Sequence, residues 1–407
     1  MNYETLAQNV KKDSATLMNL SNQVRNNALL NIANALSSSK ELIFEANKKD
    51  IANATEAGLP APILARLKFD EEKLNVCISG TKDLIHLDDP LNKILFKKEL
   101  DQNLVLTKLT CAIGVIGVIF ESRPDALIQI GTLCLKSGNC AILKGGSEAA
   151  NTNRILFDTI YKAGIESGLP KGFITLVEDR SGIDELLKCH KSIDLIIPRG
   201  SNEFVQYIMA NSKIPVMGHA DGICHIYVDK TADIDKALKI IEDSKTQYVA
   251  ACNTLETLLV HKDIYDDIVS NITDKITLNF ENINKEYLDY ILTVKKVSDI
   301  DEAISSINEN GSHHTDCILT EDEKLAEKFM NYVDSAGVYW NCSTRFADGF
   351  RYGFGAEVGI STGKLHARGP VGLDGLVTYK YTLVGNGQIV GDYASGKSQF
   401  NFKNLEV

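Results

Sequence analysis

Hydrophobic and polar residues follow two different periods along the chain. Up to about Leu87, apolar residues recur every three or four positions, as in VRNNALLNIANALSSSKELIFEANKKDIANATEAG, and this spacing predicts helices from about Tyr3 onward. The period then changes. The stretch ILFKKELDQNLVLTKLT alternates on both sides of Asp101, Gln102 and Asn103, which predicts a β-hairpin that projects from the helical region.

Short, continuously apolar runs separated by helical patterns follow this hairpin. The runs CAIGVIGVIF, NCAILKGG, GFITLVED and IDLIIPRGS read as strands, with the helices ALIQIGTLCLKSG, ANTNRILFDTIYKAGI and GIDELLKCH between them. Apolar strands that alternate with helices are typical of a parallel sheet covered on both faces. A second series of this kind runs from GICHIYVD to AGVYWNCST. We therefore predict an α/β protein with two α/β domains.

The last part of the chain contains a glycine-rich segment and a second alternating pattern. The segment RFADGFRYGFGAEVGISTGKLHARGPVGLDGL is neither repetitive nor serine-rich, and its aromatic and charged residues predict an ordered functional loop rather than a linker. Beyond it, VTYKYTLVGNGQIVGDY places Asn386 and Gly387 between alternating runs. An Asn-Gly step in this setting predicts a second β-hairpin.

Length and composition limit the class of protein. The chain has 407 residues, which suggests about two or three domains, and 44% hydrophobic with 24% charged residues is ordinary for a globular protein. The net charge of -11 argues against nonspecific binding to nucleic acid. No apolar run reaches the ~18 residues of a membrane span, and the N-terminus lacks the pattern of a signal peptide. We expect a cytoplasmic protein that does not bind membranes.

Cysteine and histidine spacing gives no sign of a disulfide framework or a metal site. The nine cysteines are odd in number, scattered, and contain no CxxC pair. His313 and His314 are adjacent but belong to no HExxH or similar ligand spacing. We therefore predict no bound metal.

Polar turns follow three of the predicted strands. They lie at Glu121–Asp125, Lys144–Ser147 and Pro198–Ser201, where the carboxyl ends of parallel strands form a ligand-binding crevice. The GxGxxG fingerprint is absent. Gly145 and Gly146 precede a predicted helix and would let backbone N–H groups approach a phosphate, with Lys144 near a ribose or phosphate oxygen. The alternative is that Lys144 is a solvated loop lysine.

One cysteine stands at the start of a predicted strand. In AACNTLETLLVH, Cys252 precedes a run from Leu255 to Val260 that reads as a buried strand. Reactive groups often occupy such junctions. Most cysteines are instead small buried hydrophobic residues, and this segment alone leaves both interpretations open.

Four segments together carry a resemblance to a known family. NENGSHHTDCI, VYWNCSTRFADG, EVGISTGKLHARGPVGLDGL and the segment around Cys252 occur in order, and the chain resembles the gamma-glutamyl phosphate reductases of the aldehyde dehydrogenase superfamily over essentially its whole length. The resemblance implies NADPH-dependent reduction of L-glutamyl 5-phosphate to glutamate 5-semialdehyde and phosphate, a step of proline biosynthesis.

The same resemblance implies an aldehyde dehydrogenase-like fold of two Rossmann-like domains with parallel sheets and a small two-part β element used in oligomerisation. We expect an NADPH-binding domain over residues 1–94 and 113–221, and a catalytic domain over residues 222–381. The oligomerisation element would comprise the hairpins at 95–112 and 382–407. A homo-oligomer is expected, and a complex with the upstream glutamate 5-kinase is a hypothesis motivated by the lability of the acyl phosphate.

By the resemblance, Cys252 is the nucleophile that forms a thioester with the substrate. Its backbone N–H and Ser122 are candidate oxyanion donors, although the superfamily carries an asparagine where this chain has Ser122. The expected cofactor-binding residues are Lys144, Gly145, Gly146, Ser147, Pro198, Arg199, Gly200 and Ser201. The expected partners of the anionic substrate groups are Arg123, Arg345, Lys364, His366 and Arg368.

One departure from the wider superfamily bears on the reaction. Hydrolytic members carry a glutamate in a Glu-Leu-Gly-Gly segment, and the corresponding VMGHADGICHIYVD contains none, which favours acyl transfer to phosphate over hydrolysis. His219 and Asp221 stay open as weak bases. Trp340 is expected to pack beneath the site, and Cys342 ranks below Cys252 as a nucleophile. The rival functions are a hydrolytic or coenzyme-A-linked aldehyde dehydrogenase and a noncatalytic nucleotide-binding homologue.

Overall fold

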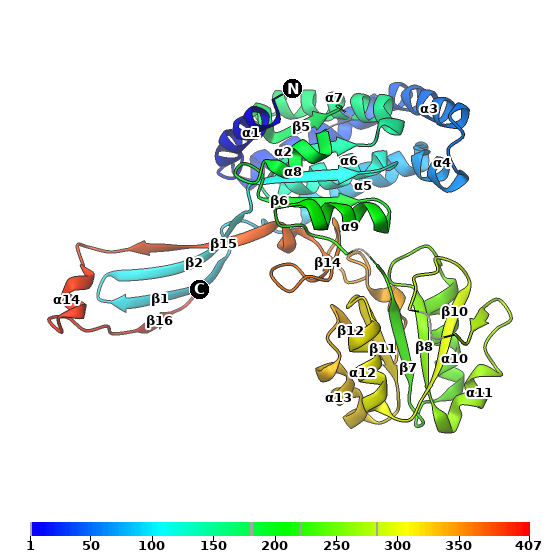
Figure 1. The fold of residues 1–407 in the computed structure, drawn as a ribbon. Coiled ribbons are helices and arrows are strands. Elements are labelled where there is room, and N and C mark those ends of the chain that lie inside the picture. The colour runs from blue at the N-terminus through cyan, green and yellow to red at the C-terminus, as the bar shows by residue number, and fades with distance from the viewer. Residues whose placement is uncertain (1, 180–181, 220, 282–283) are drawn as a thin grey trace. The chain divides into compact units, whose positions relative to one another are not determined.

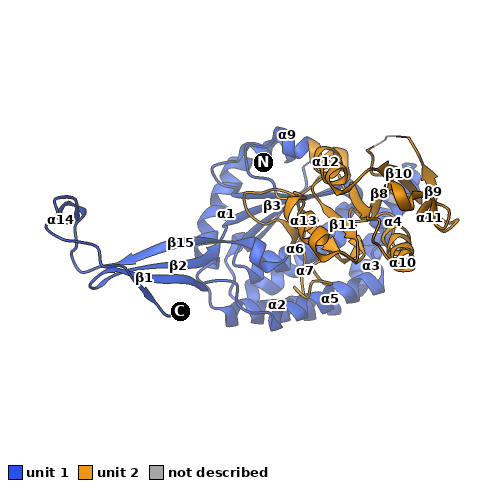
Figure 2. Ribbon diagram, turned by 90° about the horizontal axis from the view of Figure 1, so that it is seen from below, with its two compact units in different colours: residues 1–200, 207–216, 372–407 blue, residues 201–206, 217–371 orange. Residues whose placement is uncertain are grey.

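The computed structural model describes residues 2–179, 182–219, 221–281 and 284–407 (Figure 1). The chain divides into two compact units, coloured separately in Figure 2. Unit 1 comprises Met1–Gly200, Tyr207–Val216 and Gly372–Val407, and unit 2 comprises Ser201–Gln206 and Met217–Val371. Among the described residues, no helix has the length and apolar composition needed to cross a membrane. The assignment of these parts to cofactor binding, catalysis and oligomerisation stays a prediction.

Unit 1 begins with the predicted helices. They are α1 Tyr3–Leu17, α2 Asn22–Ser38, α3 Lys40–Glu56, α4 Ala61–Leu67 and α5 Glu71–His86. The side chains of Asn2, Ser21 and Asp70 each accept a hydrogen bond from a backbone N–H in the first turn of α1, α2 and α5, which explains where these helices start. The apolar stripe of α2 is buried, as the three- to four-residue spacing predicts.

A parallel sheet with the strand order β5-β4-β3-β6 follows in unit 1. Its strands are β3 Val115–Phe120, β4 Cys140–Gly145, β5 Ile174–Val177 and β6 Leu195–Arg199. The associated helices are α6 Pro124–Lys136, α7 Ala150–Glu166 and α8 Gly182–Lys188, with 3-10 turns η1 Ser147–Ala149 and η2 Lys171–Phe173. The helix α9 Asn202–Asn211 follows β6, and its residues are divided between the two units. Numbered along the chain, this order is the 3-2-1-4 of a Rossmann half, so the switch point lies between β3 and β6.

The predicted β element is one antiparallel sheet within unit 1 (Figure 1). It contains β1 Ile94–Asp101, β2 Leu104–Ala112, β15 Val377–Val384 and β16 Lys403–Leu405, with α14 Val390–Ala394 between the last two. The first predicted hairpin is confirmed, because β1 pairs with β2.

The second predicted hairpin is wrong. β15 pairs with β2 and β16 pairs with β1, so these two strands lie at opposite edges of the sheet. Gly387 does adopt a positive φ of 90°. The side chain of Gln388, however, accepts from the N–H of Asn386 and donates to the carbonyl of Gln102, and the chain continues into α14 instead of reversing.

One face of this sheet is apolar and exposed. Tyr379, Tyr381 and Leu383 alternate along β15, so they share a face, and each is more than half exposed. The ring of Phe96 on β1 joins them, with its centroid 6.1 Å from that of Tyr381. The Lys108 ammonium of β2 lies 3.6 Å from the Tyr379 centroid, a cation–π distance.

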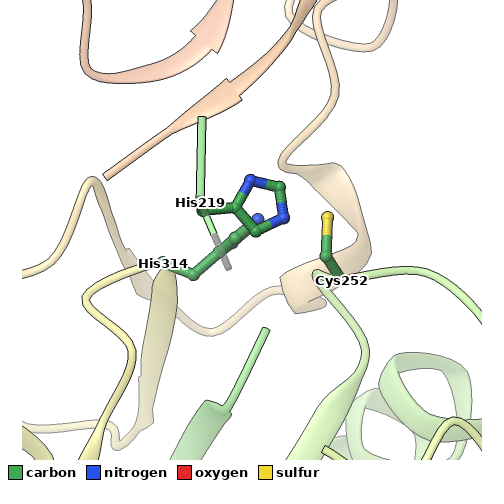
Figure 3. Close-up of side chains that lie close together, drawn as sticks. All are labelled: His219, Cys252 and His314. Carbon is green, nitrogen blue, oxygen red and sulfur yellow. The ribbon is translucent and has the colours of Figure 1, made fainter. Parts of the chain in front are cut away.

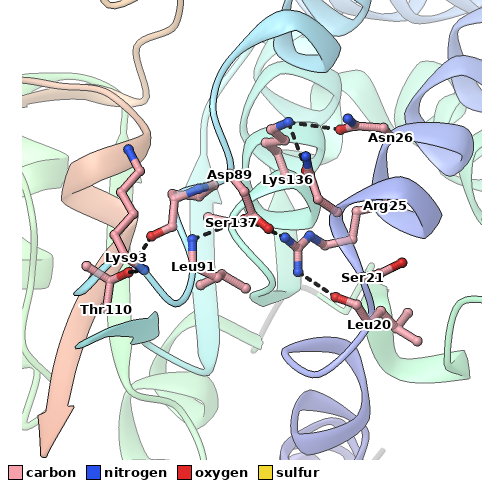
Figure 4. Close-up of polar contacts among 12 residues, drawn as sticks. Leu20, Ser21, Arg25, Asn26, Asp89, Leu91, Lys93, Thr110, Lys136 and Ser137 are labelled. Carbon is pink, nitrogen blue, oxygen red and sulfur yellow. Dashed lines mark hydrogen bonds and ion pairs between the residues drawn. The ribbon is translucent and has the colours of Figure 1, made fainter. Parts of the chain in front are cut away.

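Buried charges fix the loop that leads from the helices into the sheet (Figure 4). Arg25 of α2 is buried and donates to the carboxylate of Asp89 at 2.6 Å and to the carbonyl of Leu20 at 2.8 Å. Asp89 lies between α5 and β1 and also accepts from the N–H of Leu91. The buried Lys136 ammonium of α6 donates to Asn26 of α2 at 2.9 Å.

Unit 2 contains a second parallel sheet, with the strand order β12-β11-β7-β8-β10-β9. Its strands are β7 Cys224–Val228, β8 Leu255–His261, β9 Thr277–Asn279, β10 Ile291–Val297, β11 Thr315–Leu319 and β12 Gly337–Trp340. Its helices are α10 Ile234–Thr246, α11 Tyr265–Val269, α12 Ile300–Asn310 and α13 Glu323–Tyr332. The two predicted parallel sheets are therefore confirmed.

The faces of this second sheet are covered by helices, as its apolar strands require. Leu258 and Ile226 pack with Ile241 of α10, whereas Leu259 and Tyr227 pack with helices α12 and α13. The remaining elements of unit 2 are the antiparallel pair β13 Gly359–Ser361 and β14 Gly369–Val371, and the 3-10 turns η3 Lys262–Ile264 and η4 Thr344–Phe346. The turn η5 Leu373–Leu376 leads into β15.

Candidate active site

Cys252 lies on the turn immediately before β8, as predicted. The turn is closed by backbone hydrogen bonds from Ala251 to Tyr248 and from Thr254 to Ala251. Cys252 is half-buried, whereas every residue of β8 is buried. Because the strands of the sheet are parallel, this turn belongs to the edge formed by their amino ends.

Two histidines reach the same edge from other connections. His219 precedes β7, and His314 directly precedes β11. One ligand atom of each imidazole and the Cys252 sulfur all lie within 4.8 Å of one another. Figure 3 shows a ring nitrogen of His219 turned toward this sulfur, with His314 behind it. The two rings are nearly perpendicular, at 80°, with centroids 4.9 Å apart.

Hydrogen bonds orient both imidazoles. Nδ1 of His219 lies 2.9 Å from the carbonyl oxygen of Ile360, and since a carbonyl only accepts, this nitrogen carries the proton. His314 is fully buried, and its Nδ1 lies 2.9 Å from the Thr315 hydroxyl. Its other nitrogen, Nε2, is buried without a hydrogen-bond partner among the described residues. In each ring, the hydrogen bond of Nδ1 fixes the orientation of the imidazole.

Gly222 supports the turn of Cys252 from behind. A Cβ atom built on Gly222 would lie 2.1 Å from the Cys252 carbonyl oxygen and 2.6 Å from its Cα. No side chain fits there unless the backbone moves. The thiol of Cys224 also donates to the Cys252 carbonyl at 3.4 Å. The position of the cysteine therefore depends on close backbone packing.

Arg345 brings a positive charge to Cys252. It lies on η4, is 7% exposed, and its Nε donates to Gln247 at 2.9 Å. Burial lowers the pKa of the Arg345 guanidinium, the charge of Arg351 lowers it further, and the negative charge of an ionised Cys252 raises it. The guanidinium of Arg351 donates to the Arg345 carbonyl at 2.6 Å.

The other predicted substrate-binding residues of unit 2 lie on the connection between β13 and β14. Lys364 and Arg368 both bind the carboxylate of Asp334, Arg368 at 3.0 Å. Hydrogen bonds from these two cations lower the pKa of Asp334 despite an opposing effect of burial. His366 is exposed and has a positive φ of 121°. An anionic substrate group would compete with Asp334 for both cations.

The predicted cofactor residues at the end of β4 have structural roles of their own. Lys144 is buried and its ammonium donates to the Gly145 carbonyl at 2.7 Å. Burial lowers the pKa of Lys144, whereas Glu148 and Asp179 raise it. A Cβ on Gly145 would lie 2.3 Å from the Asn153 side chain. Packing therefore accounts for this glycine without a phosphate.

The amino end of α7 has a carboxylate from the protein itself. Asp50 of α3 accepts from the N–H groups of Asn151 and Thr152 at 3.1 and 2.7 Å, and also from their side chains. These N–H groups are the ones that a phosphate at this helix would use. Ser147 starts the 3-10 turn just before α7, and Gly146 has a negative φ of -65°.

The switch point holds the other predicted residues of unit 1. The N–H of Glu121, just after β3, donates to the carbonyl of Arg199 at the end of β6. Ser122 is buried with a positive φ of 47°, and both its N–H and its hydroxyl donate to the Glu148 carboxylate, at 2.6 and 2.8 Å. Arg123 caps α6 and is half-buried. The proposed oxyanion donor Ser122 is thus already bonded to Glu148.

The chain after β6 continues through a serine cap. Pro198 and Arg199 end β6, Gly200 follows, and the Ser201 hydroxyl accepts from the N–H of Phe204 at 3.4 Å. The backbone carbonyl of Ser201 accepts from Val205 in the first turn of α9. Gly200 and Ser201 therefore form a strand-to-helix turn beside the switch point.

Three secondary predictions have mixed outcomes. The prediction that Trp340 packs beneath the site is wrong: it ends β12, at the carboxyl edge of the sheet, is 38% exposed, and donates to the Thr320 carbonyl at 2.9 Å. Asp221 accepts hydrogen bonds from Asn202 at 3.1 Å and from Gln206 at 3.2 Å, so both of its carboxylate oxygens are bonded to residues at the start of α9. A hydrogen bond from Cys317 lowers the pKa of Cys342, so Cys342 is a rival thiol to be tested.

Sequence reasoning missed His314, Arg351 and Gly222 as parts of this site. His314 stands inside a quoted motif, but its spacing to Cys252 carries no signal because the two residues meet only through the parallel sheet. Arg351 lies in the glycine-rich segment, where its spacing does not distinguish it from the other charged residues. Gly222 lies in VMGHADGICHIYVD, the segment that lacks the glutamate of hydrolytic members. Its contact with Cys252 depends on the fold and has no signal in the sequence.

Comparisons with known proteins agree with this architecture. The model of the aldehyde dehydrogenase family matches residues 112–289. The gamma-glutamyl phosphate reductase of Ruminiclostridium cellulolyticum is 54% identical over alignments that cover 100% of this chain and 98% of that protein. The protein of the same name from Brachyspira hyodysenteriae is 49% identical, with 98% of this chain and 99% of that protein covered.

Solved structures extend the comparison to the fold. A crystal structure of gamma-glutamyl phosphate reductase from Thermotoga maritima matches with a TM-score of 0.92 and 34% identity, covering 96% of this chain and 100% of that chain. A glyceraldehyde-3-phosphate dehydrogenase from Methanocaldococcus jannaschii in complex with NADP matches at a TM-score of 0.65, 16% identity and 94% coverage of both chains, which shows the fold alone. This chain belongs to the gamma-glutamyl phosphate reductase family, within the aldehyde dehydrogenase fold.

Proposed function

We propose that this protein reduces L-glutamyl 5-phosphate to L-glutamate 5-semialdehyde and phosphate with NADPH, in the biosynthesis of proline. The observation that carries the proposal is the setting of Cys252, which combines a half-buried thiol, two imidazoles within 4.8 Å and the charge of Arg345. The substrate is inferred from two relatives that align over nearly the whole chain and are named gamma-glutamyl phosphate reductase.

Cys252 performs the covalent step. Its thiolate attacks the acyl carbon, the carbon–oxygen bond to phosphate breaks, and phosphate leaves with that electron pair, so a thioester remains on the sulfur. When bound, NADPH supplies the hydride that reduces this thioester. The resulting tetrahedral thiohemiacetal oxyanion re-forms a carbonyl and expels the Cys252 thiolate, which releases the aldehyde. We assign the backbone N–H of Cys252 as a donor to the oxyanion.

The side chains around Cys252 prepare the thiol. Arg345 stabilises a negative sulfur electrostatically. His219 keeps its proton on Nδ1 through Ile360, which leaves Nε2 as an acceptor for the thiol proton. The same Nε2 can also accept a proton from water, so the property to be measured is the ratio of phosphate attack to water attack on the thioester.

The substrate has several anionic groups to be matched. Arg345 is the substrate-binding candidate with an electrostatic interaction with Cys252, and we assign it to the group nearest the reacting carbon. Lys364, His366 and Arg368 stay candidates for the amino-acid head or the phosphate. The carboxylate of Asp334 now holds the place of such an anion at Lys364 and Arg368. Arg123 stays a candidate on the switch-point turn of unit 1.

Unit 1 offers residues that fit a dinucleotide. Its sheet has the Rossmann strand order, and Pro198, Arg199 and Gly200 follow each other at the switch point, where β6 ends. Lys144 is a buried cation at the adjacent strand end, suited to a ribose or phosphate oxygen. Because Asp50 occupies the N–H groups at the start of α7, we assign the phosphates to the chain at Arg199 and Gly200 rather than to Gly145, Gly146 and Ser147.

Two partner proposals accompany this activity. The apolar face formed by Tyr379, Tyr381 and Leu383 supports self-association through the β element, because exposed apolar patches commonly mark interfaces. A complex with the upstream glutamate 5-kinase rests on the lability of the acyl phosphate alone. Mixing the two purified enzymes should raise the coupled rate if the complex forms, and an unchanged rate speaks against it.

The test runs the reaction in reverse. Purified protein is supplied with glutamate 5-semialdehyde and NADP, with and without inorganic phosphate, and reduction of NADP is followed by absorbance. Oxidation should require phosphate, and equal rates without it would instead indicate a hydrolytic aldehyde dehydrogenase.

Matched cysteine variants identify the nucleophile. Cys252→Ala should abolish turnover but keep NADPH binding, measured by fluorescence titration, within about twofold of the wild type. Cys342→Ala should retain most activity. The reverse result, with turnover lost only in Cys342→Ala, would transfer the nucleophile role to the thiol with the lowered pKa.

A further inference from the structure

The group of His219, Cys252 and His314 is also a ligand set for a metal ion. We propose that Zn²⁺ or a similar borderline-soft divalent cation binds reversibly to these three side chains and blocks the nucleophile. Thiolate and imidazole are the ligands that zinc prefers, and sites with three protein ligands leave the fourth position to water or an anion. All three residues belong to unit 2, so the site needs no other part of the chain.

The distances lie near those of a tetrahedral site. Zinc–sulfur and zinc–nitrogen bonds of about 2.3 and 2.1 Å place tetrahedral ligand atoms ~3.5 Å apart. The three candidate atoms lie within 4.8 Å of one another. Side-chain movements of about 1 Å would therefore bring the three ligand atoms to bonding distance of one metal ion. The side chain of Cys252 is half-buried, so its rotation requires the least repacking.

A second observation points to a ligand. His314 is 0% exposed, yet its Nε2 has no hydrogen-bond partner among the described residues. A buried unsatisfied nitrogen costs free energy, and a metal ion would satisfy it. His219 also has the arrangement common in metal sites, in which the second ring nitrogen donates to a backbone carbonyl, here that of Ile360.

The charge of Arg345 limits the affinity. Its guanidinium interacts electrostatically with Cys252, so it repels a dication at the same sulfur while it favours the thiolate. The site is consequently a reversible one that a chelator empties, unlike a closed structural zinc site. Binding replaces the thiol proton by the metal ion, and a sulfur bound to metal no longer attacks an acyl phosphate. The inhibitory consequence rests on the proposed function, whereas the binding site does not.

Cobalt provides a readout that needs no catalysis. The full-length protein is freed of metal with a chelator, desalted and titrated with Co²⁺ while its absorbance is recorded. We expect one equivalent to bind with visible bands of tetrahedral intensity and a thiolate-to-cobalt charge-transfer band in the near ultraviolet, and Zn²⁺ to displace it.

Variants assign the ligands. Cys252→Ser should remove the charge-transfer band, and His219→Gln and His314→Gln should each weaken Co²⁺ binding at least 10-fold, since even outer-shell partners of a metal change its affinity 10- to 100-fold. Cys342→Ser and His86→Gln are the controls, because Cys342 is the other half-buried thiol of unit 2 and His86 is an exposed histidine of α5. If the buried His314 variant does not fold by circular dichroism, His219→Gln decides.

Two results would overturn the site: a charge-transfer band that persists in Cys252→Ser, or unchanged affinity in the decisive histidine variant. A band lost only in Cys342→Ser would place the metal on the neighbouring Cys317–Cys342 pair instead. In the activity arm, Zn²⁺ should abolish turnover and a chelator should restore it. A protein that binds Co²⁺ as expected but lacks turnover would contradict the proposed function and leave the metal site standing.

Discussion

At the scale of single residues, the reactivity of Cys252 depends on a neighbour without a side chain. Gly222 leaves the space in which the backbone of the cysteine turn lies, and a Cβ there would sit 2.1 Å from the Cys252 carbonyl oxygen. The nearest atoms belong to the backbone, so no rotamer change relieves the clash. The turn itself must shift, and the sulfur shifts with it.

We predict that Gly222→Ala lowers kcat/KM about 100-fold, since a misplacement of ~1 Å at a reacting centre has an effect of that order. Steady-state kinetics in the phosphate-dependent direction checks this. Gly80→Ala is the control, because a Cβ on Gly80 meets no atom within 4 Å and alanine favours the helix α5. Equal kinetics for the two variants would mean that the turn tolerates the displacement.

A buried ion pair near the cysteine turn makes stability depend on pH. Glu256 on β8 accepts from Lys245 of α10 at 2.7 Å, and both side chains are 0% exposed. Burial raises the pKa of Glu256 to about 7, against an ordinary 4.5, and burial lowers the pKa of Lys245. Between pH 4.5 and about 7, Glu256 is protonated in the native state and ionised in the unfolded chain, so the native state binds more protons. The contribution of Glu256 is therefore complete below pH 4.5 and is lost as the pH rises through about 7.

We predict that the double variant Lys245→Met with Glu256→Gln reduces this loss of stability between pH 5 and 7, which for the wild type is on the order of 3 kcal/mol or less. Urea midpoints at several pH values measure it. Glu242→Gln, which removes the exposed partner of Lys275, should leave the slope unchanged. A double variant with the wild-type slope would exclude Glu256 as its source.

At the scale of elements, sequence periodicity predicted most of the fold. The N-terminal helices, the strands of the first parallel sheet and the existence of the second were recognisable because their period and length follow directly from burial on one or two faces. The strand β10 of the second sheet was not predicted. The hairpin at Asn386 and Gly387 failed for a non-local reason. The partners of β15 and β16 are β2 and β1, and a turn signal does not contain the hydrogen bonds of strands distant in the sequence.

The loop into the β element relies on one carboxylate. Replacing Asp89 by asparagine leaves the buried Arg25 guanidinium without its counter-charge. Breaking a buried pair costs about 3–5 kcal/mol, and since Asp89 is 30% exposed we expect about 3 kcal/mol. Urea unfolding followed by circular dichroism should detect the loss. Asp88→Asn, at the exposed neighbour, is the matched control, and equal midpoints for both variants would show that Arg25 finds another partner.

At the scale of the whole molecule, the site was only partly predictable. Cys252 and Arg345 were predicted as site residues because each lies in a contiguous sequence motif of the family. His314 and Gly222 did not, because parallel strands separated by helices bring residues together whose distance along the chain has no fixed period. The same argument applies to Ser122, whose bond to Glu148 joins the ends of two different strands.

The assembly prediction also belongs to this scale. Leu383→Asp places a charge in the apolar face of the β element, next to Tyr381 and Tyr379, and should shift the molecule to a smaller species in light scattering coupled to size-exclusion chromatography. Thr382→Asp introduces the same charge on the opposite face and should keep the wild-type mass. If neither variant changes the mass, or both do, association does not use this face.

The position of Trp340 has a practical consequence for spectroscopy. It is the single tryptophan of the chain, and it ends β12 at the sheet edge opposite the cysteine turn, with its indole N–H bonded to Thr320. Its emission therefore reports on the integrity of unit 2 without contact with the reacting atoms. Fluorescence followed in parallel with circular dichroism, which is dominated by the helices of unit 1, turns one denaturation experiment into separate melting curves for the two units.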